Sequence, residues 1–287
     1  MTDAARNLNL RLRDGRNLSF SDIGTGENGT WIHCHGIPGS RNELLHLESA
    51  LFHAGVRVIV PDRPGYGQSS PCPGYGFSNH SDDLRQLADH LELDDVMLSG
   101  FSGGGVFAMA AAHDLGKRIE QLVIAATPAV PLMDNPFDYA SELTASTWRA
   151  ALENTEALAE ELEALTDSVD SLSEALLDAA GEKEREYLSS APVQPGFIKN
   201  LSSSLEQTPA TAARALSRDS FLTAALWPFI VEKISAPSRI IHGTEDHLVQ
   251  KEHYNALKGC LTAPQTELLD GGGHFETLSV IWRTKNT

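Results

Sequence analysis

The 287-residue sequence has few cysteines, few basic side chains and no long apolar run. The three cysteines are odd in number and widely separated, which argues against a disulfide framework and favours a reducing, cytoplasmic location. Only 22 Lys and Arg stand against 39 Asp and Glu, so the formal net charge is −17. Because binding to a phosphate backbone needs clustered cations, we expect no nucleic-acid partner. No stretch reaches the roughly 18 to 20 apolar residues of a membrane span, and the N-terminus lacks the apolar core of a signal peptide, so we expect no membrane partner.

Metal and cofactor motifs are also missing. His33, Cys34 and His35 form a cluster of ligand-type side chains, but Ile37-Pro38-Gly39-Ser40 supplies no further ligand close by. Gly103-Gly104-Gly105 lacks the G-x-G-x-x-G spacing of a dinucleotide site, and there is no Walker-type loop. We expect neither a metal nor a cofactor.

The hydrophobic pattern predicts an α/β fold. Residues 8–22 alternate apolar and polar around Asp14-Gly15, which is typical of a β-hairpin. After it, short apolar runs alternate with helical stretches, which are expected at 42–53, 81–92 and 106–115. Apolar runs without strict alternation suit strands buried on both faces, so we predict a mostly parallel, twisted sheet flanked by helices.

An all-helical cap is predicted between two parts of this core. Strand–helix alternation stops after the sixth strand, and residues 131–232 become rich in Ala, Glu, Leu and Ser. The core is then 1–130 and 233–287. An apolar stripe at helical spacing runs from Leu158 to Leu176, so it either packs on the core or forms the seam of a homodimer.

The motif with the clearest chemical meaning is Gly100-Phe101-Ser102-Gly103-Gly104, a G-x-S-x-G sequence. It follows an apolar run and precedes an Ala-rich helical pattern, which is the setting of a nucleophile elbow. Glycines flank the serine because the turn is strained and a Cβ there would collide with the neighbouring strand or helix. Ser102 would stand at a helix N-terminus, where the backbone N–H groups favour developing negative charge.

With this motif, the chain resembles the α/β-hydrolase superfamily over nearly its whole length. His35-Gly36-Ile37-Pro38-Gly39 resembles the loop that supplies one oxyanion-hole amide, at Ile37, and the other amide would be that of Gly103. Residues 62–69 resemble the D-x-x-G-x-G-x-S turn, whose role in the family is mainly structural. The segments 242–246 and 272–275 resemble the loops that carry the acid and the histidine, in the chain order Ser, Asp, His.

Physical reasoning supports the same roles. A serine hydroxyl is a weak nucleophile at neutral pH and needs a base whose pKa lies near the operating pH. His274 follows a strand-like run and a triple glycine, so it is the candidate base. Asp246 lies 28 residues earlier and would orient it, while the adjacent Glu245 is a chemically able alternative.

The expected reaction is acyl chemistry on a small-molecule substrate. A serine at the elbow excludes the haloalkane dehalogenases and epoxide hydrolases, which need aspartate there. We favour hydrolysis of a small to medium, largely apolar carboxylic ester. The residues expected to line the pocket are aromatic: Phe101, Phe137, Tyr139, Trp148, Phe221, Trp227 and Phe229.

Three alternatives stay open at this point. The same triad serves carbon–carbon hydrolysis of a vinylogous diketone. The HGIPG loop also resembles the HGGPG of proline iminopeptidases. A ligand-binding receptor on a hydrolase fold is the non-enzyme alternative.

Overall fold

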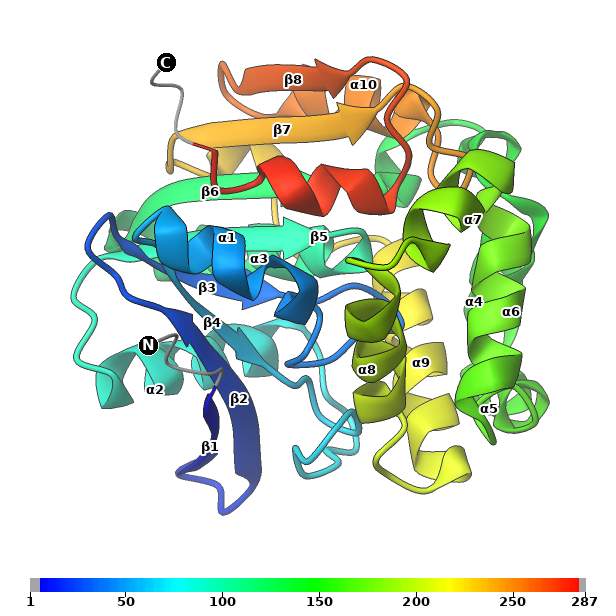
Figure 1. The fold of residues 1–287 in the computed structure, drawn as a ribbon, viewed down its shortest axis with the longest axis horizontal. Helices are drawn as coiled ribbons and strands as arrows, with labels where there is room; N and C mark the ends of the chain where they lie inside the picture. The colour runs from blue at the N-terminus through cyan, green and yellow to red at the C-terminus, as the bar shows by residue number, and fades with distance from the viewer. Residues whose placement is uncertain (1–5, 284–287) are drawn as a thin grey trace.

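An eight-stranded sheet forms the centre of the computed structural model, which describes residues 6–283 (Figure 1). The strand order is β1-β2-β4-β3-β5-β6-β7-β8. β2 pairs antiparallel with β1 and β4, and every other neighbouring pair is parallel. The strands are β1 (Arg6–Arg11), β2 (Asn17–Gly24), β3 (Thr30–Cys34), β4 (Arg57–Pro61), β5 (Val96–Phe101), β6 (Ile119–Ala125), β7 (Ser238–Gly243) and β8 (Gln265–Leu269). The predicted hairpin and mostly parallel sheet are confirmed.

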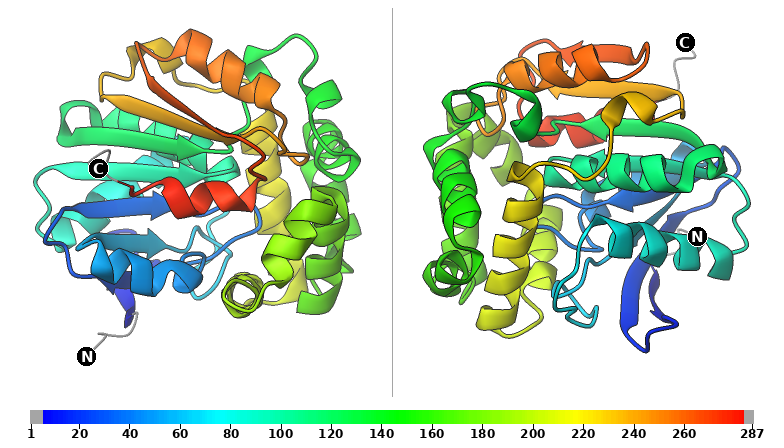
Figure 2. Two further views of the ribbon diagram at one scale, coloured as in Figure 1. Left: turned by 45° about the horizontal axis from the view of Figure 1, so that its top comes forward. Right: turned by 180° about the vertical axis from the view of Figure 1, so that it is seen from behind.

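Helices cover both faces of the sheet, as the two views of Figure 2 show. The 3-10 helix η1 (Leu45–Leu47), α1 (Glu48–His53) and the 3-10 helix η6 (Phe275–Val280) lie on one face. The helices α2 (Phe77–His90), α3 (Gly103–Leu115) and α10 (Lys251–Cys260) lie on the other. Successive residues of one strand enter different cores, since Trp31 packs with the first group and Ile32 with the second. This burial on both faces explains the continuous apolar runs of the central strands.

The helical insert lies against the end of the sheet toward which the parallel strands point (Figure 1). It follows β6 and contains α4 (Glu142–Glu153), α5 (Thr155–Glu163), α6 (Val169–Ala180), α7 (Glu182–Ser189), α8 (Gln194–Ser204) and α9 (Pro209–Ala224). The short 3-10 helices η3 (Val130–Leu132), η4 (Pro136–Tyr139) and η5 (Val231–Lys233) flank them, and η2 (Gly116–Arg118) precedes β6. An inserted helical cap is therefore present, and its limits at 131 and 232 stay a prediction.

Polar side chains set where the cap helices begin. Ser141, Asn154, Ser168 and Thr208 each accept a hydrogen bond from a backbone N–H in the first turn of the helix that follows. Such caps satisfy amide groups that have no partner within the helix. The predicted apolar stripe is turned inward, with Leu158 and Leu172 buried in clusters within the chain. A homodimer stays a prediction.

A buried ion pair joins the cap to the core. Arg63 follows β4, and its Nε donates to Oδ2 of Asp219 on α9 at 2.7 Å. The exposed fraction is 2% for Arg63 and 0% for Asp219. Arg218, next to Asp219 on α9, pairs with the other carboxylate oxygen, so the contact with Arg63 is the one that ties α9 to the core.

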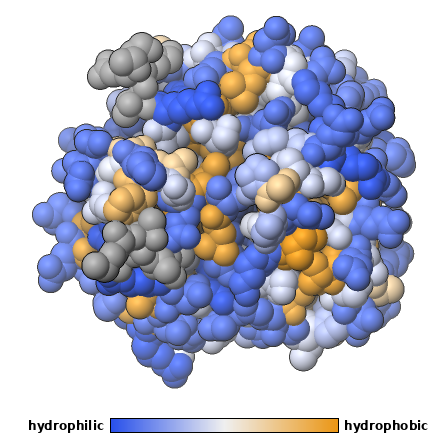
Figure 3. All heavy atoms as spheres, in the orientation of Figure 1, coloured by the Kyte–Doolittle hydropathy of each residue, from blue (hydrophilic) through white to orange (hydrophobic). Residues whose placement is uncertain are grey.

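One face of the molecule is mainly polar. Hydrophilic residues predominate on the face shown in Figure 3, and hydrophobic residues form separate patches rather than one band. Within residues 6–283, the structure contains no helix that is both long and apolar enough to traverse a bilayer.

Candidate active site

Ser102 stands in a strained turn between β5 and α3. Its φ of 52° and ψ of −132° lie outside the regions that L residues prefer, at a cost of about 1–3 kcal/mol. The backbone holds this conformation on both sides, because Ser102 N donates to the carbonyl oxygen of Ala125 at 2.8 Å and Ser102 O accepts from Gly105 N at 2.9 Å. The predicted strand–turn–helix setting is present.

The glycines on either side of the turn are required by close backbone contacts. A Cβ on Gly100 would lie 2.6 Å from the carbonyl oxygen of Gly104. A Cβ on Gly104 would lie 2.2 Å from the carbonyl oxygen of Cys34 and 2.3 Å from that of His35. Backbone atoms cannot rotate away as a side-chain tip can, so the helix can approach the sheet this closely only with glycine there.

The structure brings Asp246 and His274 together. Oδ2 of Asp246 lies 2.7 Å from Nδ1 of His274, and both side chains are buried. Oδ1 of Asp246 accepts from the backbone N–H groups of Leu248 and Val249 at 3.0 and 2.9 Å. The carboxylate is thus held in place on one oxygen while the other faces the imidazole. Glu245, the alternative acid, is exposed.

The charges around His274 favour the protonated form of its imidazole. Burial disfavours the charged imidazole, but the negative charge and hydrogen bond of Asp246 outweigh it, with a further contribution from Glu184, so the pKa of His274 is raised above 6.5. A hydrogen bond from Nδ1 to Asp246 leaves Nε2 as the nitrogen available to accept a proton.

Glu184 of α7 is a residue of this site that sequence reasoning missed. Its carboxylate accepts hydrogen bonds from the backbone N–H groups of His274 and Phe275, the latter at 2.7 Å. Burial raises the pKa of Glu184 to about 7. In the sequence it is one acid among twelve between residues 151 and 188, and nothing in its local pattern sets it apart.

Two backbone N–H groups, those of Ile37 and Gly103, are the predicted donors of an oxyanion hole. Ile37 and Gly103 both line the cavity that contains Ser102. Within residues 6–283, neither N–H donates a hydrogen bond to another residue. The Gly103 N–H is the first of α3, where the helix dipole also favours negative charge.

The side chain of Arg63 fixes the loop that carries Ile37 by hydrogen bonds to its backbone. Its Nη1 and Nη2 donate to the carbonyl oxygens of His35 and Gly36 at 2.5 and 2.7 Å. Burial, followed by the charge of Arg63, lowers the pKa of His35 well below 6.5, so this ring is neutral and accepts from Arg63 N at 3.1 Å. His35 therefore helps to shape the loop.

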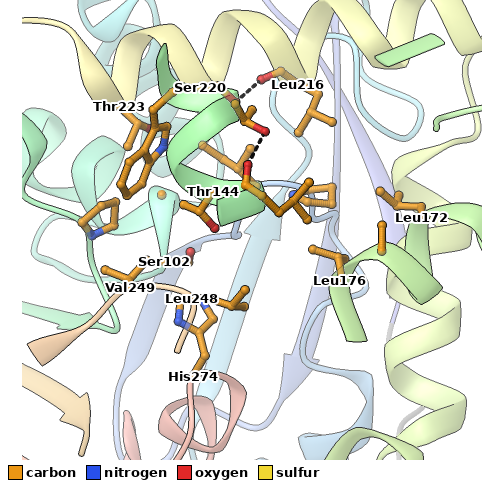
Figure 4. Close-up of a pocket in the computed structure, with 18 of the residues that line it drawn as sticks. Ser102, Thr144, Leu172, Leu176, Leu216, Ser220, Thr223, Leu248, Val249 and His274 are labelled. Carbon is orange, nitrogen blue, oxygen red and sulfur yellow. Dashed lines mark hydrogen bonds between the residues drawn. The ribbon is translucent and has the colours of Figure 1, made fainter. Parts of the chain in front are cut away.

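One cavity joins the core residues to the cap. It has a volume of about 110 Å³ and contains Ser102, His274, Ile37 and Gly103 in its lining. Figure 4 shows Ser102 and His274 on one side, with Leu172, Leu176 and Leu216 of the cap beyond them. Eight leucines line it: Leu143, Leu162, Leu165, Leu172, Leu176, Leu201, Leu216 and Leu248. Of the predicted aromatic residues, Phe101 and Trp148 line it.

The prediction for the other aromatics needs correction, because they are not among the residues that line this cavity. Phe137 lies under the guanidinium of Arg149, and Tyr139 is 37% exposed. Trp227 stacks on Phe229 with an interplanar angle of 6°. Phe221 is 37% exposed. Phe229 belongs to the buried core and Trp227 packs against it, while aliphatic side chains of the cap helices line the cavity.

The His33–Cys34–His35 cluster is occupied by other contacts. His33 bonds through Nδ1 to Ser99 Oγ and through Nε2 to Glu43, both at 2.9 Å. Across residues 6–283, no three or more His, Cys, Asp or Glu side chains are grouped so as to hold a metal ion.

Comparison with known proteins identifies the family. The family model described as alpha/beta hydrolase fold matches residues 32–277. Bromoperoxidase from Bacillus anthracis superposes with a TM-score of 0.69 and 25% identity, over 96% of this chain and 95% of that chain. A thermophilic esterase from Thermogutta terrifontis gives a TM-score of 0.70 and 24% identity, over 96% of this chain and 93% of that chain.

Among curated proteins, the non-heme chloroperoxidase CPO-A1 from Kitasatospora aureofaciens is 36% identical over 121 residues, or 41% of this chain and 43% of that protein. The first curated relatives are matched over less than half of their length.

Proposed function

The chain belongs to the alpha/beta hydrolase fold family, and we propose that it is a serine esterase acting on small to medium, largely apolar carboxylic esters. In this proposal Ser102 is the nucleophile, His274 the general base and Asp246 the acid that orients it. The buried Asp246–His274 hydrogen bond and the strained turn at Ser102 support these roles.

The reaction would proceed through an acyl-enzyme. Ser102 Oγ attacks the ester carbonyl while His274 Nε2 takes the hydroxyl proton, and the carbonyl oxygen becomes an oxyanion. The N–H groups of Ile37 and Gly103 would donate to that oxyanion. On collapse, the C–O bond to the alcohol breaks and His274 returns the proton to the leaving oxygen. Water then attacks the acyl-enzyme with His274 as base and releases the acid and free Ser102.

Asp246 contributes by fixing the tautomer and stabilising the imidazolium that forms in each step. Its carboxylate is held by the backbone N–H groups of Leu248 and Val249 and faces Nδ1 of His274. The two oxyanion donors would each contribute several kcal/mol, typically about 2.7–4 where one such donor has been removed.

The residues that line the cavity are the observation that supports a small, largely apolar substrate. His274 is the only ionisable side chain among the described residues that line it, and leucine, with eight side chains, is the commonest residue of the lining. A charged substrate group would lose its water there without gaining an opposite charge. The volume of about 110 Å³ supports a small substrate, since apolar cavities of about 150 Å³ accommodate benzene.

The same lining bears on the alternatives. An aminopeptidase would need a carboxylate to receive the N-terminal ammonium of its substrate, and no Asp or Glu occurs among the described lining residues. Carbon–carbon hydrolysis uses the same triad, so it remains an alternative that only substrates can separate. A non-catalytic receptor would have no use for the strained turn at Ser102.

A panel of p-nitrophenyl esters from acetate to decanoate tests the proposal. We expect turnover by the wild-type protein, highest for short to medium acyl chains, and a loss of about 10⁴-fold or more in kcat for Ser102→Ala. Vinylogous diketones and amino-acid p-nitroanilides are measured beside the esters, with halide oxidation included because a chloroperoxidase and a bromoperoxidase are among the similar proteins. Faster cleavage of a diketone or an anilide than of any ester would contradict the esterase proposal.

A further inference from the structure

One buried carboxylate of the cap contacts the loop that carries His274. Glu184 lies in the first turn of α7, is 3% exposed, and accepts from the N–H groups of His274 and Phe275. His274 is the N-cap residue of η6 and Phe275 is its first residue, so neither amide has an acceptor within that helix. A side chain of the cap thus holds the backbone of the proposed base.

The loop is shaped to receive this carboxylate. A Cβ on Gly273 would lie 1.7 Å from Glu184 Oε2, so only glycine permits the approach. The N–H of Gly273 itself donates to Glu276 Oε2 at 2.7 Å. Three consecutive amides, of residues 273, 274 and 275, are therefore all held by carboxylates, which fixes the backbone from which the imidazole projects.

Burying the carboxylate of Glu184 costs free energy that a purely structural contact would not need. Among the described residues, no Lys or Arg forms an ion pair with Glu184, and burial disfavours its charge. A buried carboxylate without a cation is compensated only by its hydrogen bonds, and an uncharged side chain would avoid the penalty. The group that gains from a negative charge here is the imidazolium of His274, whose pKa is raised in part by Glu184.

We propose that Glu184 is a positioning residue for the catalytic base: it holds the His274 backbone against the cap and stabilises the protonated imidazole during the reaction. The inference rests on the proposed function, in which His274 is that base. It makes cap placement a condition of catalysis, since α7 cannot move away without breaking both hydrogen bonds.

Other charged groups near Glu184 define its surroundings. Asp246 and His274 face it from the core, and Tyr187 lies one turn further along α7, where the charges of Glu184 and of Glu276 both act on it. Lys183 is exposed beside it and points toward Gly271. Asp246 contacts the imidazole directly, and Glu184 acts through the backbone and through space.

The test compares Glu184→Gln with Glu186→Gln, a matched change on the exposed side of the same helix. The rate of Ser102 labelling by a fluorophosphonate is measured from pH 5 to 9, after circular dichroism and urea titration establish folding. In Glu184→Gln we expect labelling at pH 8 to fall about tenfold and the acid limb of the profile to move to lower pH. Glu186→Gln should match the wild type in both.

A merely structural contact would lower the rate without moving the limb, so an unmoved limb in folded Glu184→Gln overturns the inference. If that variant does not fold, Glu184→Asp replaces it. This variant keeps the charge on a shorter side chain, and we expect slower labelling with the limb at the wild-type pH. If Glu184→Asp matches the wild type in both the labelling rate and the pH of the limb, the inference is also overturned. Absence of Ser102 labelling in the wild type instead overturns the proposed function.

Discussion

Asp246 Oδ2 lies 2.7 Å from His274 Nδ1, although 28 residues separate the two in the chain. The contact follows from the sheet. β7 and β8 are parallel neighbours, so the loops that follow them start at the same end of the sheet. The turn after β5 that carries Ser102 starts at that end too. A parallel sheet thus gathers three distant side chains at one of its ends.

Asp246→Asn should leave the fold intact and lower kcat by about 10⁴-fold, because the amide cannot stabilise the imidazolium and can favour the wrong tautomer. Glu245→Gln is the matched control, since Glu245 is exposed and next in sequence. Steady-state ester hydrolysis by both variants measures the difference. Equal losses would show that Asp246 has no special role.

The pH dependence of ester hydrolysis should report His274. Because Asp246 and Glu184 raise its pKa, the imidazole is protonated at low pH, and kcat/KM should rise as that proton is lost, with a midpoint above 6.5. The measurement is kcat/KM from pH 5 to 9 with a p-nitrophenyl ester. A flat profile would rule out His274 as the base.

Gly104→Ala should destabilise the protein by at least about 3 kcal/mol, because the new Cβ would lie 2.2 Å from the carbonyl oxygen of Cys34. Gly259→Ala provides the control. Gly259 lies in α10 with no atom within 4 Å of an added Cβ, so alanine there should stabilise by up to about 1 kcal/mol. Urea denaturation of both variants gives the comparison, and similar midpoints would contradict it.

Arg63→Ala should cost about 1–3 kcal/mol of stability, because it removes the buried donor to Asp219 Oδ2 and one donor each to the carbonyls of His35 and Gly36. Arg214→Ala breaks an exposed ion pair with Glu156, so its effect should stay below about 1 kcal/mol. Thermal and urea unfolding test the pair. Equal effects would mean that Arg63 does not join cap to core.

The parts that the sequence predicted are those set by local physics. Short apolar runs give strands, and the glycines around Ser102 have a steric reason that the structure makes explicit. The predicted first residues of the helices are less accurate. The helix expected from 81 begins at Phe77, and the one expected from 106 begins at Gly103, because glycines and polar residues at a first turn hide the apolar period. The stretch 42–53 is helical only from Leu45, and begins as a 3-10 turn.

What the sequence could not predict depends on how the cap packs. Large aromatics such as Trp227 were expected in the pocket, yet this ring stacks on Phe229 outside it, and leucines of the apolar stripe line the cavity instead. Glu184 acquires its role only because α7 lies against η6, a contact between segments 90 residues apart. No local pattern encodes such a pairing.

The central claim is that Ser102 is the nucleophile, and the most direct test is to locate a covalent adduct. The wild-type protein and Ser102→Ala are treated with a fluorophosphonate, digested, and analysed by mass spectrometry. We predict a single adduct on the peptide containing Ser102, and none on the variant. An adduct on another residue, or equal labelling of both proteins, would contradict the account.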